Sequence, residues 1–398
     1  MSNRHWRAVA CVVAGLLPAA AGAETVRIGL MNDQSSLYAD AAGPGSVEAA
    51  KLAIIDFQSK HPGWTVDLKI ADHQNRPDIG TSIVRKWLEI DKVDAVLDVP
   101  NSGVALAVSE LMRGSRAAFL ASSPATSDLT GTACSPNTMQ WTYDSWSLSN
   151  AIGTEIVKRG GKRWFLVAAD YAFGLAFEKD LGVAIKQASG DVIGTVRHPI
   201  NTSDFASYLL QAASADPDVI AVANAGGDTT TSIKQSVEFG LPKPRQTMVA
   251  MLLTINDVHG LGLASAKNFV LSEAFYWDTN DATRSWSRRF AAKNKGRMPT
   301  MNHAGVYSQL LAYLEAVERI RSTEVSRVYA EMRRGPIENT LFGTVTIRTD
   351  GRATHDMYVF QVKSPEESVG PYDYYKQIAR VPAARAFRPQ GEGGCPIQ

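Results

Sequence analysis

The feature that most constrains this chain is a repeated alternation of short apolar runs with longer segments of helical periodicity. From Thr25 to Ala121 the order reads β-α-β-α-β-α-β, and the same alternation begins again after Trp141. Parallel strands require this order, because each helix must carry the chain back to the same edge of the sheet. The sequence therefore predicts an α/β fold of two lobes, each a mostly parallel sheet with helices on both faces.

The remaining segments predict crossovers between the lobes rather than a third domain. Helical periodicity at 281–293, 303–321 and 325–332 is followed by strand-like runs at 344–348 and 357–362. We expect those helices to cover the first lobe and those strands to join the second. The predicted division is 24–144 plus 278–340 for lobe 1, 145–277 plus 341–378 for lobe 2, and an irregular tail at 379–398.

The first 23 residues have the pattern of a cleaved signal peptide. Arg4 and Arg7 form a basic region, Ala8–Ala21 is apolar, and Ala21-Gly22-Ala23 is a small-x-small cleavage site. A membrane anchor is the alternative, but the apolar stretch is shorter than the ~20 residues that a spanning helix needs. We expect cleavage after Ala23, export to the periplasm and no membrane insertion afterwards.

Charge and cysteine content narrow the class further. Two of the 41 basic residues lie in the signal segment, so the mature chain, with 40 acidic residues, has a net charge near −1. This balance gives no reason to expect a nucleic acid as partner. Cys134 and Cys395 remain after processing, and an even pair in an exported protein favours a disulfide. Two buried free thiols are the alternative.

Motifs of common enzyme classes do not occur. The chain contains no G-x-S-x-G elbow, no G-x-x-x-x-G-K-[ST] loop and no G-x-G-x-x-G turn. Its seven histidines show no His-x-x-x-His spacing, and Cys134 has no neighbouring thiol, so we expect no metal site and no cofactor. Asp170, Asp228 and Glu273 could act as acids in an exported hydrolase, but solvated or capping carboxylates are the simpler interpretation.

Loops at the predicted strand ends carry the candidate binding residues. Open parallel sheets bind ligands beyond the carboxyl ends of their strands, so two such sheets predict a shared cleft. First-lobe loops offer hydroxyls and backbone N–H groups, and second-lobe loops offer aromatic rings. Each residue has an ordinary alternative, namely helix capping for Ser102 and Thr126 and core packing for Phe173 and Phe275. The candidates are Tyr38, Asn101, Ser102, Gly103, Ser123, Ala125, Thr126, Tyr171, Phe173, Asn224, Asp228 and Phe275.

Short motifs resemble a known family over almost the whole mature chain, from Val26 to about Val362. That family is the periplasmic solute-binding proteins of branched-chain amino-acid (Leu/Ile/Val-type) ABC transporters. The resemblance implies a two-lobe clamp that delivers a small ligand to a membrane permease, with Ser102, Ser123 and Thr126 at the family's ligand-holding positions. The matching pieces are Asp72-x-Gln74-x-x-Pro77, Ser123–Thr130, Asp170–Gly174, Asp204-Phe205, Lys234-Gln235 with Phe239-Gly240-Leu241, and Gly343-x-Val345.

One departure from the family pattern bears on the ligand. Amino-acid binders of the family commonly carry a Glu after the strand predicted at 246–253, where this chain has Leu252-Leu253-Thr254 and no acid before Asp257. A buried ammonium without a carboxylate is strongly disfavoured. We therefore expect a small carboxylate, an aromatic acid in particular, because Ala125–Thr130, Cys134–Thr138 and Asn224–Thr229 resemble the aromatic-acid subgroup.

Three functions remain open at this point. The first is a monomeric transport receptor that binds its ligand without catalysis. The second is a sensor on the same fold that signals to a membrane receptor. The third is the exported hydrolase, which lacks an activated nucleophile or a metal.

Overall fold

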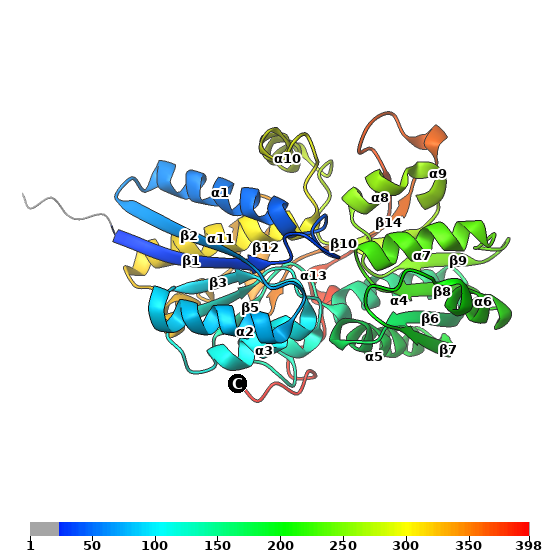
Figure 1. Cartoon of the computed structure of the whole chain (residues 1–398), viewed down its shortest axis with the longest axis horizontal. Coiled ribbons are helices and arrows are strands. Elements are labelled where there is room, and N and C mark those ends of the chain that lie inside the picture. Colours follow the sequence, from blue (N-terminus) through cyan, green and yellow to red (C-terminus); the bar gives the residue numbers. More distant parts are fainter. Residues whose placement is uncertain (1–23, 398) are drawn as a thin grey trace, which may run out of the picture.

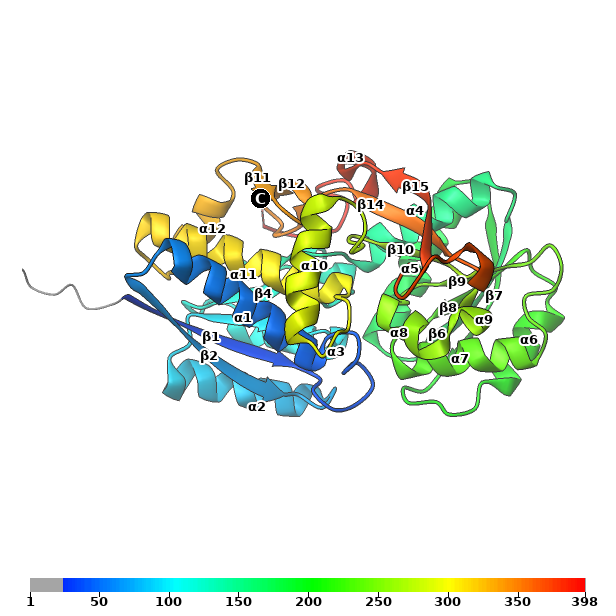
Figure 2. The ribbon, with the colours of Figure 1, turned by 90° about the horizontal axis from the view of Figure 1, so that it is seen from above.

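The computed structural model describes residues 24–397 and divides them into two lobes that lie side by side along the long axis (Figures 1 and 2). The predicted signal peptide, 1–23, lies outside the described residues. The predicted fold class, two mostly parallel sheets flanked by helices, is confirmed. Within 24–397, no helix is both long and apolar enough to cross a lipid bilayer.

The first lobe is built on a five-stranded sheet in which every neighbouring pair is parallel. Its strands have the spatial order β2-β1-β3-β4-β5. They comprise β1 (Glu24–Asn32), β2 (Trp64–Asp72), β3 (Ala95–Asp98), β4 (Ala118–Ala121) and β5 (Thr138–Gln140). The helices of this lobe are α1 (Gly43–Lys60), α2 (Pro77–Lys86, followed by a π-helical turn at Trp87–Asp91), α3 (Ser102–Met112), α10 (Asp281–Lys293), α11 (Met301–Ile320) and α12 (Val325–Met332).

Apolar side chains on both faces explain why this sheet is covered on both sides. Ile28 and Leu30 belong to the core cluster that includes α1 and α11, whereas Met31 and Val96 belong to the cluster on the α2–α3 side. Successive side chains of a strand point to opposite faces, so a strand of uninterrupted apolar residues needs helices on both. Figure 2 shows α1 and α11 running together over one face.

The second lobe is built on a seven-stranded sheet with the order β15-β14-β10-β9-β8-β6-β7. Strands β6 to β10 pair with one another in parallel. Strand β14 pairs antiparallel with β10, and β15 pairs antiparallel with β14 at the edge of the sheet. The strands are β6 (Arg163–Ala169), β7 (Asp191–His198), β8 (Val219–Ala223), β9 (Thr247–Ala250), β10 (Val270–Glu273), β14 (Met357–Val362) and β15 (Tyr375–Val381). The helices are α4 (Ser145–Lys158), α5 (Ala172–Gln187), α6 (Ala206–Ser214), α7 (Gly227–Glu238), α8 (Ile255–Leu261), α9 (Leu263–Ala266) and α13 (Ala383–Ala386).

The chain segment between α12 and β14 forms a small third sheet, which the sequence did not predict. Its strands are β11 (Ile337–Asn339), β12 (Gly343–Ile347) and β13 (Ala353–Thr354). The prediction that the strand at 344–348 joins the second sheet is wrong. The hairpin that contains it instead contacts the first sheet, where the Gln140 N–H donates to the Gly351 carbonyl at 2.9 Å. Only β14 and β15 join the second sheet.

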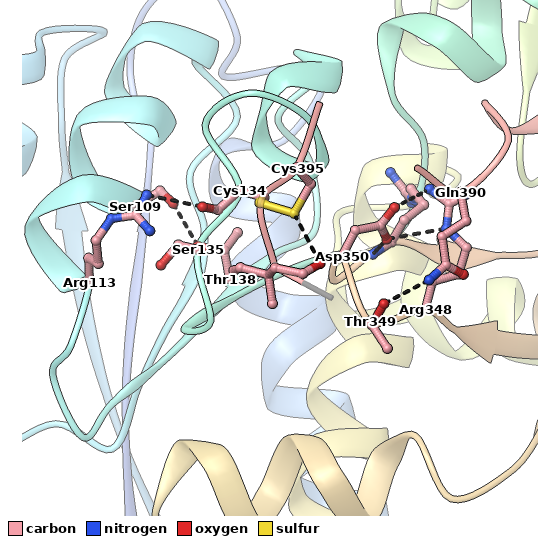
Figure 3. Close-up of a disulfide and its surroundings, with 12 residues drawn as sticks. Ser109, Arg113, Cys134, Ser135, Thr138, Arg348, Thr349, Asp350, Gln390 and Cys395 are labelled. Carbon is pink, nitrogen blue, oxygen red and sulfur yellow. Dashed lines mark hydrogen bonds and ion pairs between the residues drawn. A yellow bond between two sulfur atoms is a disulfide. The ribbon is translucent and has the colours of Figure 1, made fainter. Parts of the chain in front are cut away.

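The C-terminal segment is more ordered than predicted. The expectation of an irregular tail from residue 379 fails at its start, because β15 continues to Val381 and pairs with β14, and α13 follows. The chain then returns to the first lobe, where Cys395 forms a disulfide with Cys134 (Figure 3). Gln390 donates to Thr349 Oγ1 at 2.7 Å along this path. The predicted disulfide is therefore present.

The crossover at residues 141–144 is held by a fully buried arginine, Arg352. Its guanidinium donates to the backbone carbonyls of Trp141 and Tyr143, the latter at 2.8 Å, and lies 3.4 Å from the Asp144 carboxylate. Asp144 also begins α4 by accepting from the Ser147 N–H. Arg352 immediately precedes β13, so the β12–β13 hairpin is fastened to the first connection between the lobes.

Candidate ligand-binding site between the lobes

A cavity, called here the interlobe cavity, lies where loops from the two sheets meet. Loops after β1 and β3 contribute from the first lobe, and segments after β6, β8 and β9 contribute from the second. Its volume is about 10 Å³, roughly the room of one water molecule. A larger ligand therefore requires the lobes or their side chains to move. None of the lining residues is charged; they are Tyr38, Ala41, Pro100, Tyr143, Phe173, Ala225, Leu252 and Asn302.

Two tyrosines connect the lobes beside this cavity. The hydroxyl of Tyr38, from the loop after β1, hydrogen-bonds the hydroxyl of Tyr171, which immediately precedes α5. The Tyr171 ring stacks on Phe173 with 5.8 Å between ring centroids. Burial raises the pKa of both phenols, so both remain neutral hydrogen-bonding groups. Tyr38 and Phe173 are the two predicted site residues that line the cavity.

The carboxyl end of β3 is organised by Asp98, which is fully buried. Asn32 Nδ2 donates to Asp98 Oδ2 at 3.0 Å, and the Ser123 hydroxyl donates to Oδ1. Burial raises the pKa of this carboxyl, and these hydrogen bonds oppose that effect. The next residue, Val99, has φ of +61°, which is unusual for a β-branched side chain. This bend brings Pro100 to the cavity wall.

The other first-lobe candidates make hydrogen bonds within their own lobe. Asn101 caps α3 by accepting from the N–H groups of Gly103 and Val104 at 3.0 and 3.1 Å. Ser102 Oγ accepts from the Thr126 N–H at 3.3 Å, and Thr126 Oγ1 accepts from the Asp128 N–H at the start of a short 3-10 helix. The structure thus links Ser102 with Thr126, and none of these residues lines the interlobe cavity. Ala125 is buried beside them.

Asn224 and Asp228 belong to a polar network at the start of α7. Thr229 Oγ1 donates to Asn224 Oδ1 at 2.9 Å, and the Asn201 N–H donates to Asp228 Oδ2 at 3.1 Å. Burial raises the pKa of Asp228 to about 6, while its backbone hydrogen bonds lower it. Neither side chain lines the interlobe cavity, although Ala225 between them does.

Phe275 and the candidate acids lie elsewhere. Phe275 packs edge-on against Trp286, with 5.7 Å between the ring centroids, and also contacts Phe342. It therefore packs in the core, which is the alternative to ligand binding given for it above. Glu273 is buried and accepts from the Tyr375 hydroxyl at 3.3 Å, and Asp170 is exposed. Neither acid lines the cavity. Among the described residues, His, Cys, Asp and Glu form no group of three or more that could hold a metal ion.

Sequence reasoning missed six of the eight residues of the cavity wall. Pro100 and Ala225 follow predicted strands, so strand ends alone could have indicated them, whereas Leu252 lies inside the strand predicted at 246–253 and follows β9 only in the structure. Tyr143 follows β5 in the crossover, and its hydroxyl donates to the Ser123 carbonyl at 2.6 Å. Asn302 lies in the first turn of α11, far along the chain, where nothing local distinguishes it from a surface residue.

Comparisons with known proteins agree with this architecture. The model of the family described as "Periplasmic binding protein" matches residues 25–367. A periplasmic binding protein from Burkholderia mallei is 40% identical, with a TM-score of 0.90 over 94% of this chain and 100% of that one. A branched-chain amino-acid ABC transporter periplasmic ligand-binding protein from Burkholderia xenovorans LB400 is 36% identical, with a TM-score of 0.84 over 94% and 99%.

A third solved structure shares the fold at lower identity. It is an ABC-transporter solute-binding protein from R. palustris in complex with benzoate. It is 17% identical, with a TM-score of 0.80 over 94% of this chain and 100% of that one.

Proposed function

This chain belongs to the periplasmic binding protein family, and we propose that it is the extracytoplasmic receptor of an ABC importer. In this role it encloses a small carboxylate, an aromatic acid in particular, between its lobes and delivers it to a membrane permease. The observation that carries the proposal is the interlobe cavity, which lies at the carboxyl ends of both sheets and has an uncharged, partly aromatic wall.

The wall favours an aromatic or aliphatic body over an amino acid. Leu252 lines the cavity just after β9, where amino-acid binders of the family commonly carry a Glu. Asp257, the next acid along the chain, accepts hydrogen bonds from the Thr254 N–H and hydroxyl at 2.8 and 2.7 Å and caps α8. A ligand ammonium would therefore be buried without a carboxylate partner, which is strongly disfavoured.

A ligand carboxylate has backbone donors near the same wall. Helix α5 begins beside Phe173, and its N-cap residue Tyr171 makes no side-chain capping hydrogen bond. The first N–H groups of a helix carry partial positive charge and favour an anion. The benzoate complex of the R. palustris relative supports the same ligand class.

Export and binding without turnover complete the proposal. A disulfide between Cys134 and Cys395 suits an oxidising compartment such as the periplasm. The acids considered for hydrolysis, Asp170 and Glu273, lie outside the cavity wall. We therefore propose a clamp whose lobes move about their crossovers, with no chemical step.

A thermal-shift screen of the mature protein, residues 24–398, tests this function. The panel holds aromatic carboxylates, aliphatic carboxylates and branched-chain amino acids. A ligand that binds only the folded form stabilises it by ~2.7 kcal/mol at a hundredfold excess over its dissociation constant. We expect a shift with aromatic carboxylates and none with leucine; a shift with leucine alone would refute the carboxylate proposal.

A further inference from the structure

The loop Asp33–Ala42, called here the cleft loop, connects β1 to α1 and contacts the second lobe at three places. The Leu37 carbonyl accepts from the first N–H of α7 at 3.3 Å. The Tyr38 hydroxyl hydrogen-bonds that of Tyr171, which precedes α5. The Asp40 carbonyl accepts from an asparagine side chain of α8 at 3.2 Å. The position of this one loop therefore affects how closely the lobes approach each other.

Asp33, the first residue of the cleft loop, is buried and holds the loop in shape. Its carboxylate accepts from the N–H groups of Ser36 and Tyr38, both at 2.8 Å, and from the Ser36 hydroxyl at 2.8 Å. Asn75 Nδ2, from the loop after β2, donates to the same carboxylate at 2.6 Å. All of these partners belong to the first lobe. Asp33 thus fixes the cleft loop internally and fastens it to a neighbouring loop of its own lobe.

The ionised carboxylate suits this role because it only accepts hydrogen bonds. Burial raises the pKa of Asp33, but the hydrogen bonds from Tyr38, Ser36 and Asn75 outweigh this effect and hold the pKa below its ordinary value. A carboxylate offers two oxygens to several donors at once, and hydrogen bonds to an ionised acceptor are roughly twice as strong as neutral ones. Removal of this one group would therefore release several parts of the cleft loop together.

We propose that Asp33 is a positioning residue for closure of the receptor: it sets the path of the cleft loop so that the Leu37, Tyr38 and Asp40 contacts with the second lobe can form. Asp33 does not line the interlobe cavity, so it acts on binding through these neighbours. The inference rests on the proposed function, in which the lobes enclose a ligand.

The contacts of the cleft loop leave little tolerance for displacement. Hydrogen bonds weaken steeply with distance and misalignment, so a shift of about 1 Å would break the contacts that now measure 3.2 and 3.3 Å. These contacts exist only while the lobes touch, so their loss acts on the closed form. Coupling of this kind typically changes an affinity by about 5- to 150-fold.

Pulsed electron–electron double resonance between two spin labels tests the inference. The labels are attached to Lys51→Cys on α1 and Glu238→Cys at the end of α7, two exposed positions on different lobes (Figure 1). The native Cys134 and Cys395 do not react with the label, because they form a disulfide. Interlobe distances are recorded for the mature protein alone and with benzoate or hexanoate. Titration calorimetry measures both affinities.

Replacement of Asp33 should change the distances and the affinities together. Asp33→Ala should lose the short interlobe distances of the wild-type protein and bind the carboxylate at least about fivefold less tightly. Asp33→Asn, which keeps one acceptor oxygen, should give intermediate values. If Asp33→Ala does not fold, Asn75→Ala, which removes a single donor, should shift the distances in the same direction by less.

Asp218→Ala is the matched control. The Asp218 carboxylate also accepts from two backbone N–H groups, those of Lys162 and Arg163, at 3.0 and 2.9 Å. It directly precedes β8, at the opposite end of the strands from the cleft. This variant should unfold at lower urea concentration than the wild-type protein while keeping the wild-type interlobe distances and affinity.

The outcomes separate the inference from the proposed function. Interlobe distances that are the same in Asp33→Ala and in the wild-type protein would overturn the inference. An equal change in Asp218→Ala would also overturn it, because the effect would then reflect a general loss of stability. Failure of the wild-type protein to bind either carboxylate would count against the proposed function alone, because the ligand-free distances still decide the role of Asp33.

Discussion

Substitution of Gly226 by alanine should weaken ligand binding by obstructing contact between the lobes. Gly226 precedes α7 in the second lobe with φ of +59° and ψ of −130°, a conformation suited to glycine. A Cβ added here would lie closer than 3.0 Å to the Leu37 carbonyl oxygen of the first lobe. The neighbouring Gly227 N–H donates to that same oxygen at 3.3 Å. The variant therefore penalises the arrangement in which the lobes meet.

The size of the effect follows from the contact. Forcing extra atoms into a packed contact costs about 1–3 kcal/mol. If that cost falls only on the form in which the lobes touch, the dissociation constant rises about 5- to 150-fold. The strained backbone adds a separate loss of folding stability of about 1–3 kcal/mol, whether or not ligand is present.

Titration calorimetry and urea unfolding together distinguish these two costs. The ligand is the carboxylate with the largest thermal shift in the screen. Gly240→Ala is the matched control, because Gly240 also has a positive φ, +70°, but an added Cβ there meets no atom within 4 Å. Both variants should lose stability, but only Gly226→Ala should lose affinity. Equal affinities for the two variants would refute the reasoning.

Three further predictions concern stability. Cys395→Ser should lower the free energy of unfolding by about 2–4 kcal/mol, because the unfolded chain without the disulfide gains conformational freedom. The unfolding free energy of the wild-type protein in reductant should fall to the same value. An unfolding free energy unchanged by reduction would contradict this. Burial raises the pKa of Asp228 from 3.8 to about 6, so its contribution to the free energy of unfolding is present below about pH 4 and is lost as the pH rises through 6. The loss amounts to at most about 3 kcal/mol. Asp228→Asn should flatten this part of the pH profile of the unfolding free energy, and an unchanged slope would count against the reasoning. Arg352→Ala should cost at least about 3 kcal/mol, because it leaves Asp144 and two carbonyls buried without their donor; Arg319→Ala, which breaks a half-exposed ion pair, should cost under about 1 kcal/mol in the same urea experiment.

Local patterns predicted the secondary structure well where capping and periodicity agree. The helices at 281–293 and 325–332 have the predicted bounds, because the side chains of Asn280 and Glu324 each accept a hydrogen bond from backbone N–H groups of the first turn. The strand predicted at 246–253 is shorter, covering Thr247–Ala250, because the residues after it bend toward the cavity and lead into α8. Side chains at such bends depend on contacts with the other lobe.

Non-local contacts explain the third sheet and the packing of Phe275. The strand at 343–347 pairs with β11 and β13, because the Arg352 guanidinium and the Gly351 carbonyl fasten that hairpin to the first lobe. Phe275 follows a strand as predicted, but the aromatic partner Trp286 comes from α10, across a crossover. Neither partner is visible in the local pattern.

Residue spacing alone predicted the order of strands and helices and the parallel sheets, and the even number of thiols favoured the disulfide that the fold then forms. The side chains that meet around the interlobe cavity follow from the packing of segments far apart in the chain. Tyr38, Tyr143 and Asn302 are separated by more than a hundred residues each, and they meet because the crossovers between the lobes bring their segments to a common edge. Asn302 shows this dependence, because its Nδ2 donates at 3.3 Å to the carbonyl of Ala41, a residue from a segment far away in the chain.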